Sequence, residues 1–69
     1  MSVYILKTSI KPEDTETISD LLLKVIPKCK WNYDLEDCDH ILKIESPKNI
    51  VQLVCFHLRI CGFYCKELE

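Results

Sequence analysis

The sequence contains little glycine and little proline, one and three residues out of 69, so it has no room for a long flexible linker or a low-complexity segment. It also lacks an excess of basic residues. Its formal net charge is −2, which argues against binding to a phosphate backbone, because such binding needs clustered lysine and arginine. These absences predict a single domain over residues 1–69 without a nucleic-acid partner.

Long apolar runs are missing as well. No segment approaches the roughly 20 apolar residues of a membrane span, so we expect no membrane partner. Residues 1–7 lack the basic start, the long apolar region and the small-residue cleavage site of a secretory signal. This favours the cytoplasm, where thiols stay reduced. We therefore expect no disulfides in the odd set of five cysteines, which comprises Cys29, Cys38, Cys55, Cys61 and Cys65.

Apolar residues, 48% of the chain, follow strand and helix periodicities in turn and divide it into six elements. Pro12 ends the first strand, Pro27 stops the first helix, and Gly62 stops the second. Ser46-Pro47 predicts the start of that second helix, since serine accepts from unpaired N–H groups and proline is tolerated at the first helical position. The expected order is a strand at 3–10, a helix at 13–26, strands at 31–36 and 40–45, a helix at 46–61 and a strand at 63–68.

This order predicts two strand–helix–strand crossovers joined by a hairpin, which is an α+β fold of the ferredoxin-like βαββαβ type. Its sheet has four antiparallel strands, and both helices cover one face. In that topology the loop at 9–14, the hairpin near Asp37 and the turn at Gly62 lie at one end of the sheet. Side chains from these three segments are therefore expected to be neighbours.

The chain resembles the heavy-metal-associated domain found in copper chaperones and in the N-terminal segments of metal-pumping ATPases. The resemblance covers essentially the whole length. It depends on the βαββαβ order, on an isoleucine and leucine stripe in the first helix, and on the ending Cys61-Gly62-Phe63-Tyr64-Cys65. The family holds Cu(I) with a Met-x-Cys-x-x-Cys motif after the first strand.

That metal motif is missing here. Counting back from Ile18, which resembles the first core position of the family's helix, places Lys11 and Asp14 where the two cysteines would stand. Neither side chain replaces a thiolate for Cu(I), and lysine repels the cation. The resemblance therefore implies a degenerate member of the family, with the scaffold kept and no cofactor.

A relocated metal site is the alternative prediction. Cys38 and His40 lie at the hairpin, and Cys61 would approach from the neighbouring turn, giving a donor set that Zn²⁺, Cu or Ni²⁺ accepts. Against this, successive residues at a strand end point in alternate directions. An Asp-rich hairpin is also ordinary turn chemistry. Within the sequence no two cysteines have C-x-x-C spacing.

The remaining reactive residues favour packing over catalysis. Cys55 stands among apolar residues, and Cys65 shares strand parity with Phe63, so both are expected to pack inward. His57 is expected to be partly buried and hydrogen-bonded. A Cys–His nucleophile pair needs a third orienting group and an oxyanion site, and no pattern here indicates them, so we expect no enzyme.

The second helix is apolar around most of its circumference. One stripe comprises Ile50, Val54, His57, Leu58 and Cys61, and a second comprises Leu53, Phe56 and Ile60. We interpret the second stripe as an interaction surface for an unidentified protein. A homodimer through this helix or through an exposed sheet edge is one form of that interaction. The alternatives are a wide core stripe with Phe56 folded over the first helix, and a small-ligand regulatory domain that no motif supports.

Overall fold

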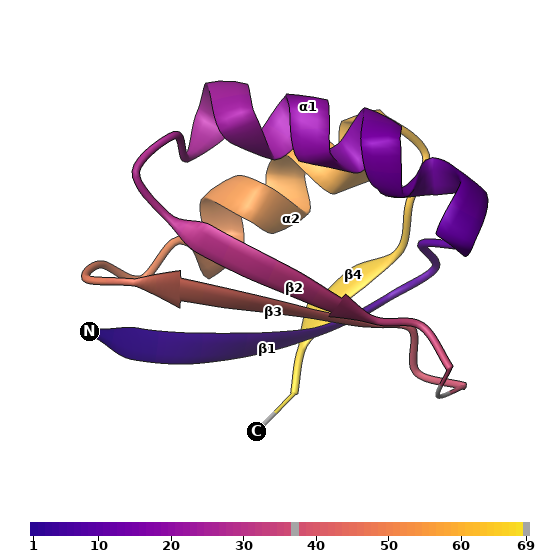
Figure 1. The fold of residues 1–69 in the computed structure, drawn as a ribbon, viewed down its shortest axis with the longest axis horizontal. Coiled ribbons are helices and arrows are strands. Elements are labelled where there is room, and N and C mark those ends of the chain that lie inside the picture. The colour runs from indigo at the N-terminus through magenta and orange to yellow at the C-terminus, as the bar shows by residue number, and fades with distance from the viewer. Residues whose placement is uncertain (37, 69) are drawn as a thin grey trace.

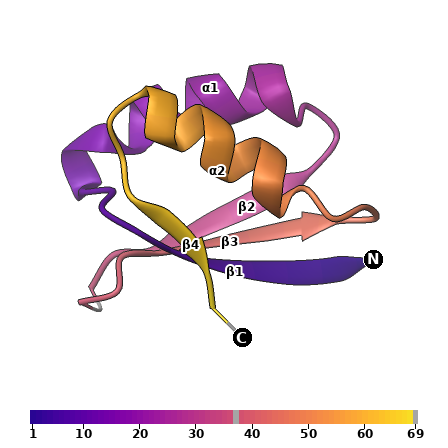
Figure 2. The same ribbon diagram turned by 180° about the vertical axis from the view of Figure 1, so that it is seen from behind.

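The computed structural model describes residues 1–36 and 38–68; Asp37, which the sequence places at the predicted hairpin, and Glu69 lie outside the described residues. A four-stranded antiparallel sheet in the order β2-β3-β1-β4 is covered on one face by two helices (Figures 1 and 2). The predicted ferredoxin-like α+β fold is therefore confirmed. The elements are β1 (Ser2–Thr8), the 3-10 turn η1 (Pro12–Asp14), α1 (Thr15–Val25), β2 (Lys30–Asp34), β3 (Ile41–Ser46), α2 (Val51–Ile60) and β4 (Cys65–Glu67).

The first strand and helix form as their patterns predict. Every second side chain along the end of β1 and the loop that follows it is buried. These residues are Leu6, Thr8 and Ile10. At the start of α1, the Asp14 carboxylate accepts a hydrogen bond from the Lys11 N–H at 3.0 Å. This bond closes the turn before the helix and places negative charge at its N-terminus, where the helix dipole favours it.

The second helix begins later than predicted. Ser46 is the last residue of β3, opposite Ser2 in the register with β1, and it is buried. Because it belongs to the sheet, it does not cap the helix; its hydroxyl accepts from the Lys48 N–H at 3.2 Å and closes a turn. The Asn49 side chain instead accepts from the N–H of Val51, the first residue of α2, at 3.0 Å. The prediction of a helix start at Ser46-Pro47 was wrong.

The end of the second helix is where the sequence predicts it. Gly62 has a φ of 90°, a left-handed conformation that glycine adopts without steric cost. The Gly62 N–H donates to the Arg59 carbonyl at 3.0 Å, and the Phe63 N–H donates to the Leu58 carbonyl at 2.9 Å. These two bonds form a Schellman motif. The turn directs the chain back along α2 into β4.

The core lies between the sheet and the two helices. It combines the inward residues of β1 and β3 with one face of each helix, including Ile18 and Leu22 of α1 and Val54 and Leu58 of α2. In the described ranges neither helix is both long enough and apolar enough to cross a membrane.

Candidate functional site

The end of the sheet where the metal site was predicted brings three segments together. The Thr8 N–H donates to the Asp39 carbonyl at 3.2 Å, and the Ser9 N–H donates to the Tyr64 carbonyl at 3.3 Å. The Tyr64 N–H in turn donates to the Ser9 hydroxyl at 2.9 Å. The loop after β1 therefore contacts both the hairpin and the turn at Gly62, as the topology predicted.

His40 holds this junction. Its Nδ1 lies 2.6 Å from the Ile10 carbonyl oxygen, and because a carbonyl only accepts, Nδ1 carries the hydrogen. The His40 carbonyl accepts from the Thr8 hydroxyl. His40 adopts a φ of 46°, a left-handed conformation that is uncommon outside glycine. Its backbone and its ring both tie the hairpin to the segment after β1.

The predicted metal ligands are not gathered into a site. Cys38 and Cys61 are exposed, and one ring nitrogen of His40 faces Ile10. Within residues 1–36 and 38–68, no group of three or more His, Cys, Asp or Glu side chains has an arrangement that would hold a metal ion. The structure therefore does not bring Cys38, His40 and Cys61 together, and metal binding by these three residues stays a prediction.

Cys55 and Cys65 form a buried thiol pair between α2 and β4. Their Sγ atoms are 2.7 Å apart, and both residues are buried, as the sequence predicted for each of them. Burial raises the pKa of the Cys65 thiol, the hydrogen bond and charge of Cys55 raise it further, and the Arg59 cation opposes the shift. This thiol therefore stays protonated and packs as an apolar group. The sequence showed that both point inward, but not that they meet.

The second stripe of α2 faces solvent. Leu53, Phe56 and Ile60 are 45%, 60% and 67% exposed. An α-helix turns by about 100° per residue, so these three lie within about 60° of one another, opposite the buried side of the helix. The Phe56 ring meets the His57 ring edge-on at 5.5 Å and does not fold into the core. The alternative of a wide core stripe that includes Phe56 was therefore wrong. We call these three residues the docking stripe.

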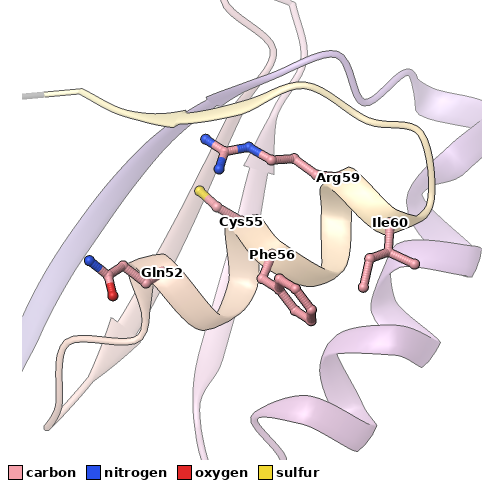
Figure 3. A pocket seen from close by; sticks show the side chains of 5 residues that line it. All are labelled: Gln52, Cys55, Phe56, Arg59 and Ile60. Atoms are coloured by element: carbon pink, nitrogen blue, oxygen red, sulfur yellow. The ribbon is translucent and has the colours of Figure 1, made fainter.

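A groove of about 590 Å³ runs beside the docking stripe (Figure 3). It is lined by Gln52, Cys55, Phe56, Arg59 and Ile60. The Arg59 Nη2 donates to the Cys65 carbonyl at 3.0 Å, so the guanidinium bridges from α2 to β4. Sequence reasoning missed Gln52 and Arg59 as lining residues. Their seven-residue spacing on one flank of the helix was the signal that would have found them.

The candidate site is thus an apolar helix face with a groove, bordered by one arginine and by the last strand of the sheet. Such a surface can bind apolar side chains, and its arginine can bind a carboxylate. In comparisons with known proteins, no family model, no curated protein and no solved structure matches this chain.

Proposed function

We propose that this chain is a small, non-enzymatic protein-interaction module of the cytoplasm that binds its partner through the docking stripe, Leu53, Phe56 and Ile60. The observation that carries the proposal is the position of these three large apolar side chains on the side of α2 opposite the core, each 45–67% exposed. A helix that covers one face of a sheet needs only its inward side to be apolar. The outward apolar side is explained by a partner that covers it.

The free energy available from such a contact is modest. Fully burying a large apolar side chain contributes about 1.5–3 kcal/mol, so covering the exposed part of three half-exposed side chains contributes about 3 kcal/mol in total. This free energy is enough for the docking stripe to form the apolar centre of an interface, with the polar groups of Gln52 and Arg59 at its rim. It favours reversible binding over permanent assembly.

The non-enzymatic part of the proposal is supported by the state of the thiols. Cys55 and Cys65 are buried, and the raised pKa of Cys65 keeps that thiol from becoming a nucleophilic thiolate. We also propose a relation to the heavy-metal-associated domains, because the chain has the βαββαβ scaffold that those domains share. At the position of the family's metal loop, the Asp14 carboxylate accepts from the Lys11 N–H and closes a turn.

Site-specific photo-crosslinking tests this function. A photoreactive residue replaces Phe56 in the full chain, which is expressed in the cells it comes from. We expect a discrete crosslinked product that is lost when Leu53→Lys and Ile60→Lys are added, because these changes place charge in the apolar contact. The matched control carries the photoreactive residue at Asn32, an exposed polar position on β2. If position 56 gives no product beyond those of position 32, the docking stripe is not an interface.

A further inference from the structure

The outer edge of β4 adjoins the docking stripe. β4 is the last strand in the sheet order, and no further strand lies beside it in the described ranges 1–36 and 38–68. An edge of this kind offers N–H and C=O groups to which a second strand can pair. Arg59 and Cys55 line the groove and both contact Cys65 of this strand. The groove and the strand edge therefore form one continuous surface.

The pairing of β4 with β1 decides which of its backbone groups point outward. The Ser9 N–H donates to the Tyr64 carbonyl, and the Leu68 N–H donates to the Ile5 carbonyl. Backbone groups alternate in direction along an antiparallel strand, so those of Cys65 and Glu67 point away from β1. The Cys65 carbonyl accordingly accepts from Arg59 at 3.0 Å.

We propose that a second copy of this chain binds at this edge, with the two β4 strands antiparallel about a two-fold axis and Cys65 of each copy opposite Glu67 of the other. This inference rests on the proposed function and names its partner. The register uses the residues whose backbone groups point outward, so each Cys65–Glu67 pair exchanges two backbone hydrogen bonds. The resulting contact is self-complementary, as a two-fold interface requires.

The charges along the edge fit this arrangement. Arg59 lies at one end of the surface, at the Cys65 carbonyl, and the exposed Glu67 lines a hollow with Gln52 at the other end. The two-fold axis brings Glu67 of each copy beside Cys65 of the other, within the reach of Arg59. The guanidinium then exchanges a carbonyl acceptor for a carboxylate, which forms the stronger hydrogen bond.

The position of the second helix also fits. Figures 1 and 2 place α2 on the side of the sheet that ends in β4. The two-fold axis between the two β4 strands therefore brings both α2 helices to the same face of the joined sheet. Neighbouring strands are 4.7–4.9 Å apart and packed helices 8–10 Å apart, so one helix covers about two strands and the two helices can lie side by side over the joined edge.

One feature of the register opposes association. Lys66 lies between Cys65 and Glu67 on the opposite face of the strand and is exposed. In the proposed register the two Lys66 side chains are directly opposite each other across the axis, and opposed like charges weaken a strand pair. The register therefore makes a specific prediction: Lys66→Gln strengthens the dimer.

Sedimentation of the full chain under reducing conditions, from micromolar to millimolar concentration, tests the inference. We expect a reversible dimer whose Kd rises about tenfold or more in Arg59→Glu and in Glu67→Arg, because each change replaces two attractive pairs by two repulsive ones. The double variant R59E/E67R restores the original Kd, and Lys66→Gln lowers it. The matched control is Lys43→Glu, an exposed charge on the interior strand β3, which leaves the Kd unchanged. Circular dichroism shows that each variant is folded.

A chain that stays monomeric at millimolar concentration overturns the inference, and so does a dimer that neither charge reversal weakens. The inference is also overturned if both single variants weaken the dimer but the double variant does not restore the original Kd, since the Arg59–Glu67 pair is then absent. A monomer that still crosslinks to another protein at position 56 overturns the second copy as partner and leaves the proposed function standing. A monomer without that crosslink overturns both.

Discussion

The Nδ1 atom of His40 lies 2.6 Å from the Ile10 carbonyl oxygen and joins the segment before β3 to the loop after β1. In the proposed relation to the heavy-metal-associated domains, that loop stands where those domains carry the metal-binding cysteines. Here the imidazole uses one nitrogen to hold the loop in place. A residue that the sequence indicated as a metal ligand thus has a structural role in the described chain.

Replacing His40 tests this role. His40→Ala removes the side-chain hydrogen bond, and we expect the free energy of unfolding to fall by about 1–2 kcal/mol. His40→Gly removes the same bond but adopts the left-handed backbone without strain, so we expect its loss to be smaller by about 0.5–1 kcal/mol. Urea denaturation measures both. If alanine and glycine leave the stability unchanged, the bond to Ile10 contributes nothing.

Gly62 isolates the cost of backbone conformation. A Cβ placed at this residue meets nothing within 4 Å, so a substitution there is opposed by the φ of 90° alone. We expect Gly62→Ala to lower the free energy of unfolding by about 1–2 kcal/mol and Gly62→Asn to lower it less, since asparagine tolerates the left-handed region. Thermal denaturation compares the two variants. Equal stability of the wild type and Gly62→Ala would contradict the Schellman ending of α2.

The raised pKa of Cys65 makes stability depend on pH. The unfolded thiol has an ordinary pKa of 9.0, while burial and Cys55 hold the folded value above it. Above pH 9.0 the unfolded chain loses a proton that the folded chain keeps, so this contribution is fully present below that pH and is lost as the pH rises. The loss approaches about 1.4 kcal/mol per pH unit.

Urea denaturation at pH values below and above 9.0, with Cys65→Ala as the comparison, measures this loss of stability. The variant is less stable at neutral pH because it leaves a small cavity in the core, but its stability should decline less steeply above pH 9.0. The same slope in both proteins would show that another group is responsible. Tyr33, whose pKa is raised mainly by burial, contributes only nearer its ordinary value of 10.0.

Metal titration tests the alternative that the sequence left open. We expect Zn²⁺ and Cu⁺ titrations, followed by calorimetry under reducing conditions, to reveal no tight stoichiometric site, because the described residues offer no cluster of three ligands. Cys38→Ser is the informative comparison. A tight site with one metal per chain that this substitution abolishes would establish metal binding at the hairpin.

Much of the fold followed from local pattern. The alternation through Leu6, Thr8 and Ile10 predicted the buried face of β1, and the glycine at position 62 predicted the end of α2. The exposed stripe at Leu53, Phe56 and Ile60 was predicted from helical spacing as well. Each depends on side-chain polarity or backbone freedom within a few residues, which the sequence displays directly.

The start of α2 and the role of His40 did not follow from local pattern. Ser46 was a good cap by its own chemistry, but the strand register with Ser2 took it into the sheet. His40 was a good ligand by its own chemistry, but the topology placed it beside Ile10.

The sequence by itself determined the main apolar faces of the core, such as that of Leu6 in β1 and Ile10 after it, because burial there follows the periodicity of apolar side chains along the chain. Only the tertiary structure decided how Ser46, His40 and Arg59 use their polar atoms. The physical reason is that a polar side chain can form equally good hydrogen bonds with several alternative partners. The bond that it forms depends on which backbone groups the strand pairing leaves within its reach.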